Sequence, residues 1–154
     1  MNLLDIENYT DEMTISQVIR FFERKNIFFT KTMIQNYVKV ELLPPPLHKR
    51  YYLKKHLILL SFIDNLKSVY SLSEMKYVFS LIDVSELYSN YIDLYNQLNE
   101  ENIRSTNENL KTVSLLADAE SVNAEIKNFL TILMLMNQSV LIKQQVTNLL
   151  EGQN

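Results

Sequence analysis

The sequence lacks cysteine altogether and has a single glycine in 154 residues, Gly152. The absence of cysteine excludes disulfides, thiolate zinc sites, iron–sulfur clusters and a cysteine nucleophile. Average usage would give roughly ten glycines in a chain of this length. Phosphate-binding loops and glycine-turned hairpins need residues that adopt positive φ freely. Nucleotide-binding α/β folds and most all-β folds are therefore disfavoured, and we expect a mainly helical protein.

Export signals and long apolar runs are missing as well. The first fifteen residues are acidic and polar, so we expect no signal peptide. The most apolar stretch, Phe129 to Ile142, is interrupted by Asn137, Gln138 and Ser139. It falls short of the roughly 18 to 20 apolar residues that span a bilayer. The sequence predicts a cytoplasmic protein with no membrane partner.

The net charge of −3 conceals a strongly basic block. Residues 1–19 sum to −4, residues 20–56 to +7 and residues 57–154 to −6. A basic block inside an acidic protein is typical of a phosphate-binding surface, because attraction depends on the local field. The alternative is a solvated basic face whose charges happen to cluster.

Two short helices are expected near the N-terminus. Thr14 and Gln17 form a capping-box pattern that opens the first helix, and Asn26 is expected to end it. Thr30 is a second N-cap, followed by a helix with apolar residues at helical spacing up to Val38. Two helices joined in this way are a candidate helix-turn-helix.

An extended segment and two more helices follow. Pro44, Pro45 and Pro46 cannot be helical, and residues 47–53 are suited to a small β-ribbon with two bases at its tip. Helical spacing resumes at Lys54. The pattern from Ser71 to Glu74 is another capping box and opens a helix that continues to about residue 82.

The C-terminal part is acidic and predicts long helices. Leu87, Tyr91, Leu94 and Leu98 have the 4-3-4 spacing of a coiled-coil-like seam. Residues 100–109 are polar, which indicates either a break or a stutter. A last helix is expected from about 119 to 150. Its residues 129–136 are apolar nearly all round, so a partner helix should cover it, and dimerisation is the expected means. Tyrosines and methionines in this part either line a ligand pocket or pack the core.

The order of these parts resembles the winged DNA-binding domain of the MerR family of bacterial transcription regulators over residues 14–82. The resemblance is carried by the helix ending in Tyr37, the Leu42–Pro46 run, Arg50 to Tyr52, and the start at Ser71. The chain also resembles a group of small proteins of low-GC Gram-positive bacteria that share this head and have no assigned function. The resemblance implies a winged helix-turn-helix head at residues 12–82. Residues 83–150 are expected to form a helical tail that dimerises the protein, and whether this tail also senses a small-molecule effector is left open by the sequence.

Some positions match the family and others depart from it. Thr30 occupies the N-cap of the recognition helix, Ile34 and Tyr37 occupy core or backbone-contact positions, and Lys49 and Arg50 lie where the wing reaches phosphates. Gln35 replaces the usual arginine, and Asn36 replaces a tyrosine. Glu41 replaces the glycine that ends the helix, so the helix is expected to end differently here.

The expected function is sequence-specific DNA binding by a homodimeric transcriptional regulator. The candidate DNA-binding residues lie on the second helix and on the tip of the ribbon: Thr30, Lys31, Thr32, Gln35, Asn36, Tyr37, Lys39, His48, Lys49 and Arg50. Amide side chains can form bidentate bonds to adenine, and basic side chains bind guanine or phosphate. The alternative is a protein–protein interaction module whose basic face meets an acidic protein.

No enzyme, cofactor or metal site is expected. Neither of the two histidines has a carboxylate at matching helical spacing. Asp118 and Glu120 are two residues apart, so a helix would point them to different faces. No serine has a histidine base placed by a motif. The sequence names no small-molecule effector.

Overall fold

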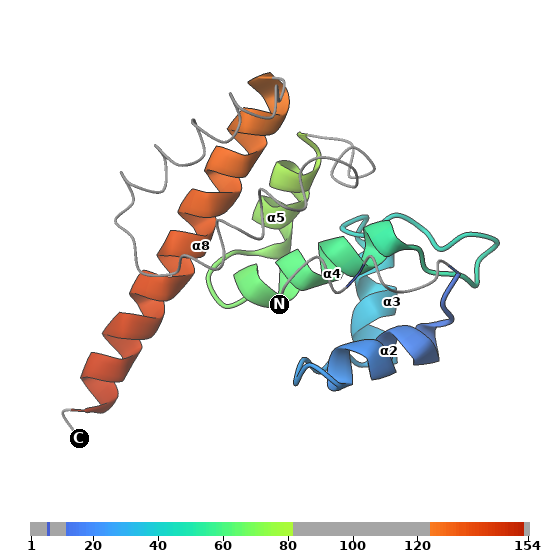
Figure 1. The fold of residues 1–154 in the computed structure, drawn as a ribbon, viewed down its shortest axis with the longest axis horizontal. Coiled ribbons are helices and arrows are strands. Elements are labelled where there is room, and N and C mark those ends of the chain that lie inside the picture. The colour runs from blue at the N-terminus through green and yellow to red at the C-terminus, as the bar shows by residue number, and fades with distance from the viewer. Residues whose placement is uncertain (1–5, 7–11, 82–123, 153–154) are drawn as a thin grey trace.

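The computed structural model describes residue 6, residues 12–81 and residues 124–152. Five helices are described: α2 (Ile15–Glu23), α3 (Lys31–Lys39), α4 (Lys54–Leu66), α5 (Leu72–Phe79) and α8 (Ala124–Glu151). The protein is therefore mainly helical, as the composition predicted. Figure 1 shows α2 and α3 on one side of α4, and α5 and α8 on the other. The predicted seam at residues 87–98 and the polar interruption after it lie outside the described residues.

The helix starts follow from local hydrogen bonds that the sequence predicted. Gln17 Oε1 accepts a bond from the Thr14 backbone N–H at 2.8 Å. Ser71 and Glu74 cap reciprocally, because each side chain accepts a bond from the other residue's N–H at 3.1 Å. These bonds satisfy amide groups that the first turn of a helix leaves without an internal partner.

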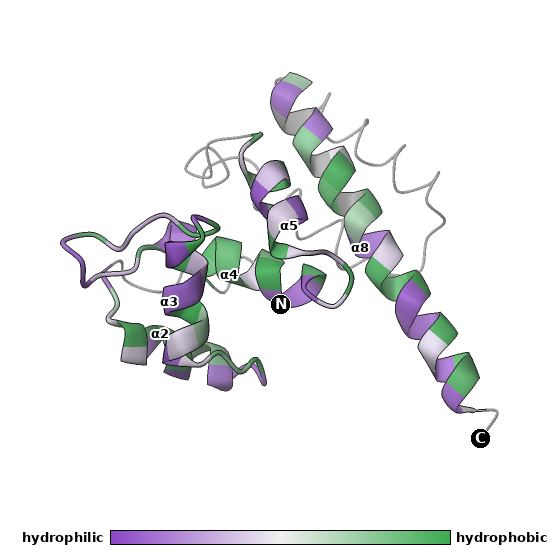
Figure 2. Cartoon of the chain, turned by 180° about the vertical axis from the view of Figure 1, so that it is seen from behind, coloured by the Kyte–Doolittle hydropathy of each residue, from purple (hydrophilic) through white to green (hydrophobic). Residues whose placement is uncertain are grey.

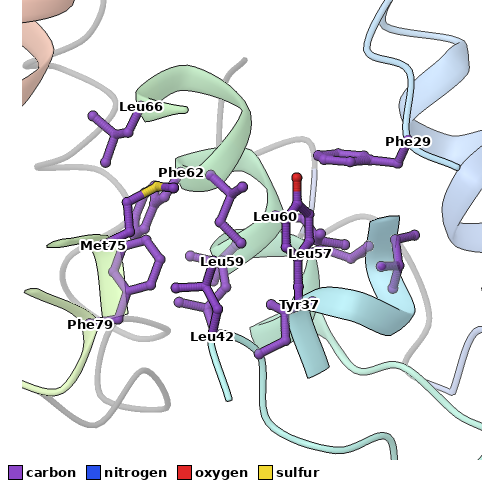
Figure 3. Close-up of a cluster of buried hydrophobic side chains, with 14 of the residues drawn as sticks. Phe29, Tyr37, Leu42, Leu57, Leu59, Leu60, Phe62, Leu66, Met75 and Phe79 are labelled. Atoms are coloured by element: carbon purple, nitrogen blue, oxygen red, sulfur yellow. The ribbon is translucent and has the colours of Figure 1, made fainter. Parts of the chain in front are cut away.

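Helix α4 is the centre of the core. All its residues from His56 to Ile63 are buried, so it must be covered from several directions. Figure 3 shows Phe29, Tyr37 and Leu42 on one side of it, and Met75 and Phe79 on the other. Helix α8 contacts α4 and buries an apolar stripe with 4-3-4 spacing: Phe129, Leu133, Met136 and Val140.

Polar contacts tie the middle of α8 to the end of α4. The Asn65 amide donates to Asn137 Oδ1, and the Tyr70 hydroxyl donates to Ser139 Oγ at 3.0 Å. Lys143 Nζ donates to the Ser68 carbonyl at 2.7 Å. No described helix is long and apolar enough to cross a membrane.

The expected β-wing is wrong. Residues 12–81 and 124–152 contain no strand, and the segment after α3 makes only the isolated bridges Met13–Tyr52 and Leu47–Tyr51. The physical reason is that prolines 44–46 have no N–H to donate to a ladder. The chain also turns back immediately after Leu47. Too few residues remain on either side of the turn for strand pairing.

Candidate nucleic-acid interface

Helix α3 separates an apolar face from a polar one. Thr30 caps it by accepting a bond from the Met33 N–H at 3.1 Å, and Ile34 and Tyr37 face the core. The other face consists of exposed side chains that donate or accept hydrogen bonds: Lys31, Thr32, Gln35, Asn36 and Lys39. We call these five residues the α3 face. Figure 2 shows the hydrophilic colouring of α3. The structure therefore brings together the candidates predicted on this helix, with one exception.

Tyr37 is the exception, because it is buried. Its ring meets Phe29 edge to face with centroids 6.4 Å apart, and Figure 3 shows it pointing toward Phe29. Burial raises the pKa of the Tyr37 hydroxyl, and the nearby negative charge of Asp64 raises it further. Tyr37 therefore supports the position of α3 from behind, and we correct its assignment from a DNA contact to a core residue.

Helix α3 ends in the geometry that a glycine would give, although Glu41 is there. Glu41 has φ 62°, its N–H bonds to the Val38 carbonyl at 3.1 Å, and the Leu42 N–H bonds to the Tyr37 carbonyl at 2.9 Å. This pair of bonds is a Schellman motif. Lys76 of α5 donates to Glu41 Oε2 at 2.9 Å, and this bond lowers the pKa of the Glu41 carboxyl. The expectation that the helix would end differently is therefore wrong.

A tight turn at residues 47–51, here the tip turn, holds the remaining candidates. His48 and Lys49 have φ of 52° and 60°, and the Arg50 N–H bonds to the Leu47 carbonyl at 3.1 Å. This is the pattern of a type I′ turn, which usually contains asparagine and glycine. Arg50 lies over the Tyr51 ring at 5.3 Å. The three side chains of His48, Lys49 and Arg50 are all exposed.

The tip turn is attached to the core at both ends. Met13 and Tyr52 exchange two backbone hydrogen bonds of 2.9 and 2.7 Å. His56 holds the other end: its Nδ1 accepts from the Leu53 N–H at 2.9 Å, so Nε2 carries the proton and donates to the Pro44 carbonyl at 3.0 Å. Burial lowers the pKa of His56, which favours the neutral imidazole that these two hydrogen bonds require. The turn is therefore presented on a fixed base.

Two residues of this region were missed by sequence reasoning. His56 is fully buried, whereas the sequence suggested an ordinary helix residue; its place three residues after the N-cap Leu53 is the signal that could have found it. Phe28, just before α3, is 67% exposed, which is unusual for a phenylalanine. Its position between Lys25 and Lys31 was the available signal.

Three bases lie in the last turn of α2 and just after it. Arg20 and Arg24 are exposed, and Lys25 lies over the Phe21 ring at 5.6 Å. Among the described residues no group of three histidine, aspartate or glutamate side chains is placed to hold a metal ion. The described residues present exposed cations and amides on the α3 face and exposed cations on the tip turn.

The fold and these surfaces define a small helical protein with an exposed basic helix and turn. The chain belongs to the family described as "Domain of unknown function (DUF1836)", which matches residues 2–98. No curated protein and no solved structure matches the chain. No MerR-like or helix-turn-helix family matches it either, and together with the missing strands this overturns the resemblance to the MerR winged domain. The expected likeness to a family of unknown function is confirmed.

Proposed function

We propose that the protein binds double-stranded DNA in a sequence-specific manner and regulates transcription as a homodimer. The observation that carries this proposal is the α3 face: five polar or basic side chains exposed on a helix whose opposite face is fixed in the core. The proposal includes a cytoplasmic location. It depends on the local geometry and charge of α3 and the tip turn.

The α3 face has the chemistry that reads base edges. Gln35 and Asn36 can each pair with the N6 and N7 groups of adenine, and Lys31 and Lys39 can reach guanine or phosphate. A helix fits the width of the major groove. Because Ile34 is buried and Thr30 caps the first turn, the helix is held rigidly enough to position these side chains.

The tip turn has the chemistry of a backbone contact. Lys49 and Arg50 are exposed cations, and the backbone bonds at residues 13 and 52 fix where they stand. Contacts to phosphate orient a protein on the duplex but carry no sequence information. The tip turn therefore contributes mainly to affinity, and the α3 face contributes the sequence specificity.

The first experiment is fluorescence anisotropy with the natural upstream region of the gene and with a random duplex pool. Gln35→Ala and Asn36→Ala should each reduce the preference for the upstream DNA by about 5- to 150-fold if each bidentate pair contributes about 1 to 3 kcal/mol, and the double variant should remove the preference. Lys49→Ala with Arg50→Ala should weaken both duplexes alike. The matched control is Gln144→Ala with Asn148→Ala, which changes the same residue types at exposed positions of α8.

Salt dependence gives an independent measure. Lys31, Lys39, Lys49 and Arg50 are the four bases of the proposed interface. If all four contact phosphate, log affinity should fall against log salt with a slope of about −3.6 per bound head. Absence of binding to either duplex at low salt, or the same loss for the α3 and control variants, would overturn the assignment.

A second candidate is a protein–protein interaction module that uses the same face. Exposed apolar side chains lie beside the cations: Phe28 at 67%, Val40 at 37% and Leu47 at 39%. Aromatic side chains are enriched in protein interfaces, whereas DNA interfaces are dominated by charge. Phe28→Ala should leave DNA affinity unchanged under the first proposal, and it should abolish binding of an acidic protein partner under the second.

A further inference from the structure

Helix α8 has a second apolar stripe, on the side away from the core. Its members are large apolar residues that remain exposed: Leu135 at 39%, Ile142 at 55%, Val146 at 49% and Leu149 at 70%. We call them the outer stripe. Their spacing is seven, four and three residues, which is the heptad spacing of a helix that packs along another helix. At 100° per residue the outer stripe lies about 140° around the helix from the buried stripe that contacts α4.

The contacts of α8 with the rest of the described protein end where the outer stripe becomes prominent. Val140 is the last buried residue of the helix. Lys143 makes the last described bond from α8 to residues 12–81, here called the head, by donating to the Ser68 carbonyl. Every residue from Ile142 to Glu151 is exposed. Figure 1 shows this half of α8 extending beyond α4 and α5. An isolated helical extension of this length is marginally stable in water.

The charge pattern points to a second copy of this chain as the occupant. Residues 144–150 contain no charged side chain; Gln145 flanks the outer stripe there, whereas Gln144 and Asn148 lie on the opposite side of the helix. In a twofold dimer the same patch meets its own copy, so a patch with net charge of one sign would repel it, whereas an uncharged apolar patch would not. The heads carry a strongly basic segment and would repel each other, whereas this part of α8 has no such cost. We propose that the outer stripe is the homodimer interface, with Ile142, Val146 and Leu149 at its centre.

This inference rests on the proposed DNA binding only for the purpose of the dimer, which is to hold two DNA-binding heads together. The dimer itself is tested without DNA, by light scattering of the full chain after size-exclusion chromatography. The wild type should have about twice the chain mass of 18.2 kDa at micromolar concentration. Val146→Glu should give the single-chain mass with an unchanged circular dichroism spectrum. Gln144→Glu, about 160° around the helix from Val146, is the matched control and should remain dimeric.

A cross-linking experiment tests the same interface even if the Val146→Glu variant fails to fold. The chain contains no cysteine, so Val146→Cys introduces a single thiol. A short bis-maleimide should convert this variant to a covalent dimer several-fold more efficiently than Gln144→Cys. A monomeric wild type, a dimer that survives Val146→Glu, or equal cross-linking of both cysteine variants would overturn the interface. A monomeric wild type would also indicate that another segment of the same chain covers the stripe.

The DNA assay separates this inference from the proposed function. If both hold, the Val146→Glu monomer should keep salt-dependent binding to any duplex but lose its tight binding to a site with two half-sites. If the dimer fails while the α3 variants still change sequence preference, only the interface is overturned. If the dimer forms and no duplex binds, only the DNA proposal is overturned.

Discussion

The tip turn stores backbone strain where its cations are exposed, and replacing its two central residues should release it. His48 and Lys49 both have positive φ, a region that costs an ordinary L-residue about 1 to 2 kcal/mol. Asparagine tolerates this region and glycine occupies it freely, which is why Asn-Gly is the preferred type I′ pair. We therefore expect His48→Asn with Lys49→Gly to stabilise the fold.

The magnitude follows from two opposing terms. Relief of strain at two positions is offset by the greater freedom of glycine in the unfolded chain, about 0.5 to 1 kcal/mol. A net gain of about 1 to 3.5 kcal/mol in the free energy of unfolding remains, which corresponds to a rise in Tm of about 2 to 14 °C for a chain of this size. Thermal and urea denaturation followed by circular dichroism would measure it.

The same double substitution removes one of the proposed phosphate contacts, so DNA affinity should fall while stability rises. Lys49→Ala is the control: it removes the charge but leaves a non-glycine residue at positive φ, so Tm should stay near that of the wild type. An unchanged or lower Tm for the double variant would refute the reasoning from strain. If affinity stayed the same in both variants, the tip turn would not contact DNA.

Three further predictions concern the support of the interface. Burial lowers the pKa of His56, whereas the unfolded chain titrates near 6.5, so the unfolded state takes up the proton first. Stability should be greatest above about pH 6.5 and decline below it, and His56→Gln should flatten this decline in urea titrations at several pH values. Thr30→Ala removes the cap of α3 and should cost about 1 kcal/mol and weaken DNA binding, which Thr30→Ser should largely restore. Leu60→Ala in the fully buried part of α4 should cost about 3 to 5 kcal/mol in denaturant unfolding, and a smaller loss would mean that the site collapses around the cavity.

Local signals were enough to predict where the helices begin. Ser71 and Glu74 form the reciprocal bonds that their spacing indicates, and Thr30 caps α3 as expected. These interactions involve residues within one turn, so they can be found without knowing the fold. Helix α2 ends at Glu23, three residues before the predicted Asn26, and Asn26 closes the turn that follows at φ 58°, a conformation that asparagine is one of the few residues to tolerate.

The errors arose where the outcome depends on tertiary contacts. The ribbon predicted for residues 47–53 failed because the chain turns back right after Leu47, so only the Leu47–Tyr51 pair forms, and the prolines before Leu47 cannot extend the pairing. His56 was predicted as an ordinary helix residue because its hydrogen-bond partners are backbone groups of Leu53 and Pro44, which no side-chain pattern reveals. Tyr37 was given either a core or a backbone-contact position and was counted among the DNA contacts; packing against Phe29 leaves it only the core position.

The backbones of α3 and the tip turn are fixed while their polar side chains are exposed, and this affects how DNA would be recognised. Thr30 and Tyr37 fix α3, while the bonds from Met13 and His56 fix the tip turn, so the backbone of both elements is already in place before a partner arrives. Little ordering of the chain would then oppose binding, and the cost falls mainly on long side chains such as lysine. Under the proposed function, specificity would come from the bidentate bonds that Gln35 and Asn36 can form to a base, and the lysines would contribute mainly to affinity. The sequence preference should then be nearly independent of salt even though the affinity is not.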